Sequence, residues 1–235
     1  MFSDTKNASQ LVRSYQKIAV TIDCVIFGYQ DGQLKVLLIK SDLENYTEQW
    51  SLLGNEITHT ETTDEAAYRV LKQRTGLSDV FLDQVKCFST PDRHPGGRVV
   101  TVAYCSLINI AHHQLTCTDN DLHWHPVQDE IDWAFDHKEI FETCYGWLQK
   151  RIQEHPLGFS LLPEKFSLRE LQGVYEAILG MKLDRRNFRK KFFTMDFLED
   201  TGEMELNVAH RPGKLYTFNY KKYESGKKDW VGIDF

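Results

Sequence analysis

Several features that organise other proteins are missing from this chain. No apolar run approaches the ~20 residues that cross a bilayer, and the opening stretch MFSDTKNASQ lacks the apolar core of a secretory signal peptide. The five cysteines are odd in number and include no Cys-x-x-Cys pair, which disfavours a disulfide framework or a zinc site. We therefore expect a cytoplasmic protein with no membrane contact, no metal and no cofactor.

The net charge of −6 conceals an asymmetry along the chain. Residues 160–235 carry 14 Lys and Arg against 12 Asp and Glu, whereas the remaining residues carry 14 against 22. Segments of opposite charge balance indicate two domains with different partners. A chain of 235 residues with 41% hydrophobic content is long enough for two modest domains with their own cores.

The most informative stretch is Trp50–Leu77, WSLLGNEITHTETTDEAAYRVLKQRTGL. Thr62 and Glu65 have the spacing of a capping box, which predicts a helix starting near Thr62. Apolar residues then recur at helical spacing, and Gly76 occupies the position where a left-handed glycine ends many helices. The same pattern also fits an ordinary amphipathic helix with a glycine stop.

Strands are expected on both sides of this helix. Lys17–Tyr29 is rich in β-branched and aromatic residues, and an Asp-Gly turn separates it from a partner strand at Leu34–Lys40. Residues 1–16 are polar, either frayed or forming a short helix near Leu11–Tyr15. Further strands are predicted at Val80–Phe88 and Val99–Asn109.

The loop Thr90–Arg98, TPDRHPGGR, joins these last two strands and is a candidate ligand rim. Charged side chains on a loop between rigid strands are commonly used for binding. The candidates are Asp92, Arg93, His94 and Arg98, although each one alone also fits a solvated charged turn.

After an irregular stretch at Leu122–Trp133, the segment from His137 predicts a long helix that ends before Pro156. We place the domain boundary after this helix, giving a first domain at residues 1–156 and a second at 157–235. In the second domain, Ser167 and Glu170 form another capping box. Gly180 ends that helix and Asp184 caps the next one. Strands are expected at Leu206–Ala209 and Leu215–Tyr220.

Helix, short turn, helix and hairpin is the order of a winged helix-turn-helix, which binds DNA. On the second helix Phe188 and Phe192 share one face, while the opposite face is basic and includes one amide. Such a face suits phosphate neutralisation and reading of base edges. The candidate DNA-binding residues are Arg185, Arg186, Asn187, Arg189, Lys190, Lys191, Arg211 and Lys214. A solvated basic helix on a protein-interaction module is the alternative.

The Trp50–Leu77 stretch resembles the Nudix box of nucleoside-diphosphate-linked hydrolases. Glu61, Arg69, Leu71, Gly76 and Leu77 fall on that pattern. In the family, three carboxylates after the arginine lie on one helix face and hold Mg²⁺ against a diphosphate. Those positions are Val70, Gln73 and Arg74 here, and Asn55 replaces the opening glycine. The resemblance implies a Nudix-like domain, a mixed sheet sandwiched by helices, that binds its ligand but is not an enzyme.

Followed by the winged helix, with the segments LLPEKFSLRELQGVYEAILGMKLDRRNFRKKF and RPGKLYTF, the chain resembles the Nudix-related transcriptional regulators of bacterial NAD metabolism. The resemblance implies a homodimeric, nucleoid-associated repressor of genes for NAD synthesis or salvage. Its effector would be ADP-ribose or a related NAD metabolite, and its operator a palindromic double-stranded DNA.

Without Mg²⁺, a bound diphosphate needs direct neutralisation by Arg or Lys. Our ligand-binding candidates are Lys40, Arg74, Arg93 and Arg98, with Trp50 available to stack on adenine. Arg74 also fits an exposed arginine that pairs with a glutamate. Two other functions stay open: an active hydrolase that uses Glu61 and Glu65 as metal ligands, and a ligand-sensing module that binds protein.

Overall fold

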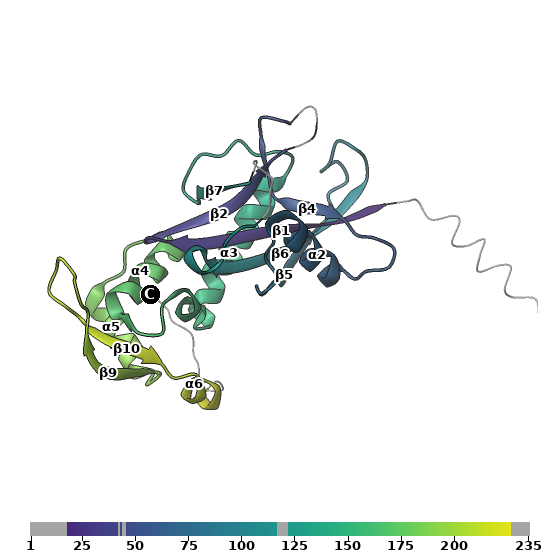
Figure 1. Cartoon of the computed structure of the whole chain (residues 1–235). Helices are drawn as coiled ribbons and strands as arrows, with labels where there is room; N and C mark the ends of the chain where they lie inside the picture. The colour runs from purple at the N-terminus through teal and green to yellow at the C-terminus, as the bar shows by residue number, and fades with distance from the viewer. Residues whose placement is uncertain (1–17, 42, 44–45, 117–121, 227–235) are drawn as a thin grey trace, which may run out of the picture.

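The computed structural model describes residues 18–116 and 122–226, apart from positions 42, 44 and 45. The predicted helix near Leu11–Tyr15 and the first residue of the predicted Lys17–Tyr29 strand therefore lie outside the described residues. A mixed sheet occupies the first part of the chain (Figure 1). Its strands are β1 (Ala19–Gln30), β2 (Gln33–Lys40), β3 (Trp50–Ser51), β4 (Leu53–Glu56), β5 (Asp83–Phe88), β6 (Val99–Asn109) and β7 (Leu122–Pro126).

Strand β1 is the centre of this sheet. It pairs antiparallel with β2 and β4 and parallel with β6, while β5 pairs with β6, and β3 and β7 pair with β2. Residues 22–28 of β1 are all buried. Because successive side chains on a strand point to opposite faces, β1 supplies the core on both sides of the sheet.

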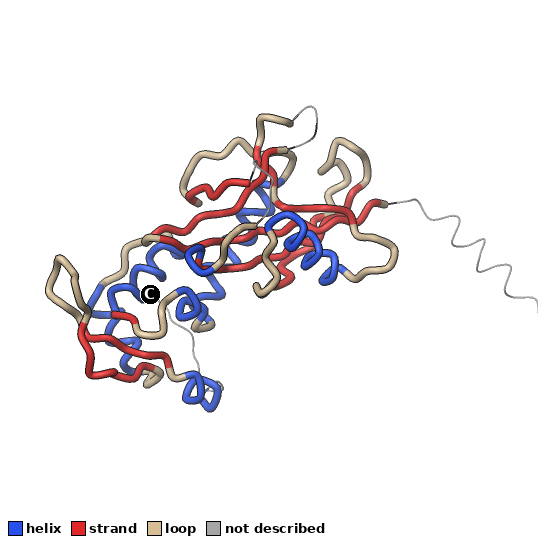
Figure 2. Tube along the Cα trace, in the orientation of Figure 1, coloured by secondary structure: helices blue, strands red, loops and turns tan. Residues whose placement is uncertain are grey.

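One helix covers each face, as the helices drawn against the strands in Figure 2 show. Ile22, Cys24 and Ile26 pack with buried residues of α2 (Thr63–Thr75). Val25 and Phe27 belong to the core on the other face, which includes α3 (His137–Glu154). The result is the helix–sheet–helix sandwich that the sequence predicts.

The second part of the chain is mostly helical. It contains α4 (Leu168–Leu179), α5 (Arg185–Thr194) and α6 (Tyr220–Gly226), with a small sheet of β8 (Phe166–Ser167), β9 (Leu198–Met204) and β10 (Lys214–Phe218). The described residues also include two 3₁₀ turns. Of these, η1 (Ile110–His112) follows β6 in the first part of the chain, and η2 (Leu157–Leu161) follows α3.

The predicted helix starts and stops match the structure closely. Thr62 and Ser167 each form a complete capping box, with Glu65 and Glu170 respectively. Gly76 and Gly180 end their helices in the left-handed conformation, at φ 77° and 71°. These signals are local in sequence, which is why the sequence reveals them.

Four predictions about strands need correction. The stretch predicted as irregular contains β7, an edge strand that is paired with β2. The first wing strand lies at β9 rather than at Leu206–Ala209, because β10 pairs with residues 198–204. Strand β5 begins at Asp83, three residues later than predicted, and β3 and β4 lie between β2 and α2, where no strand was predicted.

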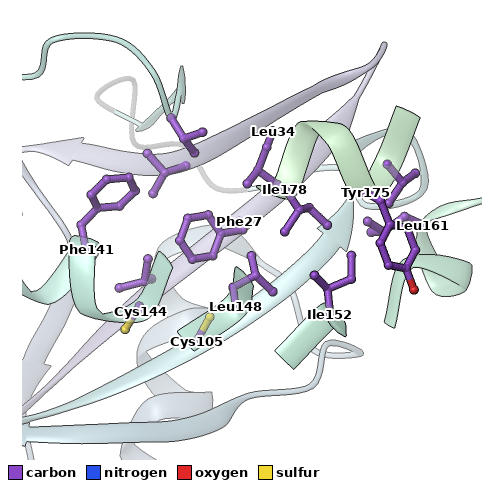
Figure 3. Close-up of a cluster of buried hydrophobic side chains, with 14 of the residues drawn as sticks. Phe27, Leu34, Cys105, Phe141, Cys144, Leu148, Ile152, Leu161, Tyr175 and Ile178 are labelled. Atoms are coloured by element: carbon purple, nitrogen blue, oxygen red, sulfur yellow. The ribbon is translucent and has the colours of Figure 1, made fainter. Parts of the chain in front are cut away.

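The two parts share one hydrophobic core. The cluster that begins with Val25 and Phe27 in β1 continues through α3 into α4 and α5. Figure 3 shows Phe27, Leu148 and Ile178 in the same interior as Tyr175. The winged helix is therefore packed onto the sheet domain rather than attached by a free linker. Within the described ranges, no helix has both the length and the apolar character needed to cross a membrane.

Candidate functional site

The first candidate site is a cavity of about 570 Å³ at one end of the sheet. Side chains from β1, from the β3–β4 segment and from the end of α2 border it, together with the loops around residues 93 and 135. Its lining includes Thr21, Asp23, Lys40, Ser51, Gly54, Asn55, Arg74, Arg93, His94, Phe135 and His137.

A buried carboxylate lies at this cavity. Asp23 is in the middle of the buried strand β1, and its side chain is 8% exposed. Thr101 Oγ1 donates a hydrogen bond of 2.7 Å to Asp23 Oδ2. A Cβ atom on Gly54 would lie 2.2 Å from Asp23 Oδ1, so the paired strand β4 can pass this carboxylate only with glycine at that position.

His137 fixes the other side of Asp23. Its Nδ1 accepts a 3.0 Å hydrogen bond from the backbone N–H of Leu52. Burial lowers the pKa of His137, which favours the neutral ring. With Nδ1 as acceptor, the neutral ring carries its proton on Nε2, 3.8 Å from Asp23 Oδ1.

Arg93 is a buried cation between two carboxylates. Its guanidinium makes a bidentate contact with Asp136, at 2.8 Å from Nε to Oδ2 and 2.7 Å from Nη2 to Oδ1. Nη2 also lies 3.9 Å from Asp23 Oδ2, and the Arg93 side chain is only 4% exposed. These contacts with the two carboxylates set the position of Arg93 in this structure.

The aromatic side chain of Phe135 also lines the cavity. The ring of Phe135 lies 4.4 Å from Tyr46 and 5.1 Å from His94, measured between ring centroids. Phe135 has a backbone φ of 54°, a left-handed conformation that is unfavourable for a bulky side chain. Such strain persists only where the surrounding contacts enforce it.

The sequence-based ligand candidates divide in two. Lys40, Arg74 and Arg93 line the cavity, but Trp50 and Arg98 do not. The Trp50 ring packs against His123 and His125, at 5.3 and 4.3 Å, on the opposite side of its strand from Ser51.

Arg98 is bound to its own loop instead. Its Nη1 donates to the carbonyl oxygens of Ser89 and Thr90, at 2.8 and 3.2 Å. Lys40 makes a similar local contact, since its Nζ donates to Glu48 O at 2.6 Å and lies 4.5 Å from the Trp50 ring centroid. The sequence could not predict these contacts because they depend on the direction of each side chain.

The three box positions on α2 carry no carboxylate. Val70 is buried in the core, Gln73 accepts a hydrogen bond from Arg69, and Arg74 borders the cavity. Within the described residues, no group of three His, Cys, Asp or Glu side chains is arranged to hold a metal ion.

The acidic residue that the box retains is engaged elsewhere. Glu61 pairs with Arg69 through contacts of 2.6 and 2.9 Å and accepts from the Thr58 amide. The Arg69 hydrogen bond lowers the pKa of Glu61 to about 2. Glu61 therefore stays ionised and serves to fix the loop before α2.

Sequence reasoning missed Asp23 and His137, which line the cavity, and Thr101 and Asp136, which bond to cavity residues. One signal was available: Asp23 is the only charged residue in the otherwise apolar segment Val20–Tyr29. A charged group inside a buried strand needs a partner, so its presence indicated a polar site. Its partners Thr101 and His137 lie 78 and 114 positions away in the sequence, so no local pattern indicated them.

The second candidate site is the exposed face of α5. Asp184 caps this helix by accepting a hydrogen bond from the Asn187 amide, and Phe188 and Phe192 are buried beneath it. Four cationic side chains are exposed and make no hydrogen bond or ion pair within the described residues: Arg185, Arg186, Arg189 and Lys190. Asn187 is also exposed, whereas Lys191 is partly buried.

A groove of about 810 Å³ runs between α5, the start of α4 and the wing. Arg185 and Arg189 line it from α5, and Arg211 and Lys214 line it from the wing. Arg169 and Gln172 of α4 also face this groove, and the sequence analysis did not select them. Lys214 is paired with Asp200 at 2.5 Å, while Arg211 is exposed.

Comparisons with known proteins match both regions. A family model described as the NUDIX domain matches residues 17–144, and a model described as the NrtR DNA-binding winged helix domain matches residues 158–218. The ADPR responsive transcriptional repressor NtrR of Acinetobacter baylyi is 31% identical over 215 residues, covering 89% of this chain and 86% of the relative.

Solved structures agree with these matches. Shewanella oneidensis NrtR complexed with a 27-mer DNA has a TM-score of 0.73 at 30% identity, covering 87% of this chain and 95% of that one. The NUDIX domain of the same NrtR, complexed with ADP ribose, has a TM-score of 0.55 at 26% identity, covering 63% of this chain and 99% of that one. This chain therefore belongs to the NrtR family of Nudix-related transcriptional regulators.

Proposed function

We propose that this chain is a transcriptional repressor of NAD synthesis or salvage genes that binds double-stranded operator DNA and responds to ADP-ribose or a related NAD metabolite. The observation that carries this proposal is the pairing of two cationic sites in one molecule. One is a partly open cavity lined by Lys40, Arg74 and Arg93, and the other is a helix face with four exposed cations that have no ion-pair partner within the described residues. The relatives that bind DNA or ADP ribose support both assignments.

For the DNA-binding site, α5 acts as the recognition helix. Arg186, Asn187 and Lys190 are exposed and available to a major groove, where Arg pairs with guanine and Asn with adenine. Arg185 and Arg189 face the groove toward the wing, where a phosphate backbone finds Arg211 and Lys214 on the other wall. Lys191 is a partly buried residue of α5 and contributes charge without direct base contact.

For the ligand site, Arg93 and Arg74 neutralise the diphosphate. Arginine donates paired hydrogen bonds that match phosphate oxygens as well as carboxylate oxygens, and the Arg93 side chain is buried at the cavity. Lys40 adds a third positive charge at the rim. Phe135 and His94 offer apolar ring surface to the base or the ribose.

The same cavity is not built for hydrolysis. The two acidic residues that could replace the missing box carboxylates are engaged in holding the chain. Glu61 pairs with Arg69, and Glu65 closes the capping box with Thr62, whose hydrogen bonds lower the pKa of Glu65. A metal ion would have to break these contacts before it could bind.

The domain assignment is residues 1–156 for ligand binding and 157–235 for DNA binding, with both in the bacterial cytoplasm at the nucleoid. Repressors of this type bind as two-fold dimers, and a homodimer would place two α5 helices about 34 Å apart, or a multiple, on a palindromic site. The shared core between the domains supports such fixed spacing.

The test is a fluorescence-anisotropy titration of labelled duplex from upstream of NAD-synthesis genes, repeated at several salt concentrations. We expect binding that weakens steeply with salt, because α5 releases counterions from phosphates. A parallel incubation of ADP-ribose with Mg²⁺ should leave the nucleotide intact. Salt-independent or absent duplex binding, or metal-dependent release of AMP, would contradict the proposal.

A further inference from the structure

The N-terminus of α3 is unlike those of the other three long helices in the described chain. Thr62, Ser167 and Asp184 each accept a backbone hydrogen bond and cap their helices. Asp136 occupies the same position on α3, and aspartate is a strong capping residue. Its side chain makes no capping hydrogen bond, and its ψ of 17° departs from the extended backbone of the other caps.

Arg93 explains the missing cap. Both carboxylate oxygens of Asp136 are bound by Arg93, so neither reaches the amides of the first turn. The residue before it, Phe135, is held in the left-handed conformation. The start of α3 therefore combines an unused cap with a strained backbone, next to the ion pair that occupies the Asp136 carboxylate.

The other half of α3 reaches the DNA-binding domain. Gln149 Nε2 donates to the carbonyl oxygens of Ile178 and Leu179, at 3.3 and 3.1 Å. These carbonyls end α4, directly before the Gly180 turn that leads to α5. Ile152 and Ile178 also share the common core. A helix of 18 residues is about 27 Å long. As one rigid helix, α3 therefore extends from the cavity to the end of α4, which leads into the recognition helix α5.

We propose that Arg93 and Asp136 form a two-position switch through which the ligand acts on the DNA-binding domain; this inference rests on the proposed function. Without ligand, Arg93 binds Asp136. A diphosphate in the cavity offers Arg93 two anionic oxygens and takes over its hydrogen bonds. Asp136 is then free to cap α3 by accepting from the amide of Lys138, because the Glu139 amide already donates to the backbone carbonyl oxygen of Asp136 at 2.9 Å.

The exchange of partners at Arg93 makes the liganded protein differ in structure from the ligand-free protein, as regulation requires. A ligand shifts a conformational equilibrium only if it binds one state more tightly. Here the ligand favours the state in which Arg93 has left Asp136, and the new cap re-aims the first turn of α3. Because α3 is rigid, that change reaches the end of α4 and the position of α5.

The test uses Asp136→Asn, which weakens the ion pair but keeps a good capping side chain. In the wild-type protein, ADP-ribose should change the DNA dissociation constant by a factor on the order of 5 to 150. In D136N that factor should fall to about 1, and the DNA affinity without ligand should equal the liganded wild-type value, whichever direction that is. Titration calorimetry should show that D136N still binds ADP-ribose.

Glu139→Gln is the matched control. Glu139 is an exposed residue of the same helical turn, and its substitution removes the same charge by the same chemistry. E139Q should keep the wild-type response. A D136N protein that responds to ADP-ribose as the wild type does would overturn the switch and leave the proposed function intact. A wild-type protein that binds DNA without any response to ADP-ribose would overturn both.

Hydrogen exchange on the wild-type protein provides a measurement that needs no variant. ADP-ribose should slow exchange at the amide of Lys138, because a new cap protects it, whereas the Glu139 amide is already bonded to the Asp136 carbonyl oxygen. Unchanged exchange at the Lys138 amide in the ligand-saturated protein would overturn the switch.

Discussion

Arg93 and Arg189 are the same side chain in opposite surroundings. Arg93, in the sheet domain, is buried and paired with Asp136 and Asp23. Arg189, in the winged helix, is exposed and makes no ion pair within the described residues. A paired, buried cation can exchange its carboxylate partner for one small anion, whereas unpaired exposed cations suit the repeated phosphates of a duplex. The two binding sites therefore differ in whether their arginines are paired with carboxylates, rather than in how many cations they contain.

The two domains share one hydrophobic core, so they are not independent. Disrupting this core should have the largest effect on the stability of the protein. Phe188 is fully buried between α4 and α5, so Phe188→Ala should lower the free energy of unfolding by about 3–5 kcal/mol. Urea denaturation followed by circular dichroism measures this loss. Because the core spans both domains, we expect one cooperative transition in the wild-type protein. Two separate transitions would mean that the domains fold independently.

Exchanging each arginine for alanine sharpens the comparison directly. Arg93→Ala leaves Asp23 and Asp136 without their cation and should destabilise the protein by about 2 kcal/mol, since Asp136 keeps some contact with water. Arg189→Ala should change stability by no more than about 0.5 kcal/mol. Equal losses for the two variants in chemical denaturation would remove the distinction between them.

The order should reverse in DNA binding. Arg189→Ala should weaken duplex binding by about 1–2 kcal/mol and lower the salt slope by about 1, because one phosphate contact is lost. The control is Lys72→Ala, an exposed lysine on α2 in the sheet domain. If K72A weakens binding as much as R189A in the same anisotropy assay, net charge rather than the α5 face drives association.

Residues of α5 should also differ in whether they recognise bases or bind the phosphate backbone. Asn187→Ala should relax sequence preference, whereas Lys190→Ala should weaken binding to all duplexes alike. A panel of duplexes with single base-pair changes in the operator measures this difference. Equal loss on every duplex for both variants would contradict the assigned roles.

The smallest expected effect concerns the pH dependence of the Glu61–Arg69 pair. The pKa of Glu61 is lowered to about 2, below its ordinary value near 4.5. A carboxyl with a depressed folded-state pKa contributes stability above the unfolded pKa, and this contribution is lost as pH falls toward 2. Glu61→Gln should therefore be slightly less stable than the wild type at neutral pH, with the difference shrinking below pH 4.5. A constant difference between pH 7 and pH 2.5 in thermal melts would argue against this pair.

The sequence predicted features that depend on neighbouring residues. The caps at Thr62, Ser167 and Asp184 and the glycine stops were visible because each signal spans a few positions. The short edge strands β7 and β9 were missed or misplaced, because their pairing rather than their composition defines them.

The ligand cavity was only partly predictable for a similar reason. Arg93 was selected from its loop, but its partner Asp136 lies 43 positions away. Trp50 was selected for its type, but its ring faces the histidines of β7 instead of the cavity. The α5 face was predictable because helical geometry alone decides which side chains oppose Phe188 and Phe192.

The most direct test of the central claim is a single titration of ADP-ribose into a preformed protein–DNA complex in a metal chelator, followed by recovery of the nucleotide. The account predicts a saturable change in DNA occupancy with all of the ADP-ribose recovered intact. An unchanged complex at saturating ADP-ribose would contradict it, as would a response that appears only with added Mg²⁺ and consumes the nucleotide.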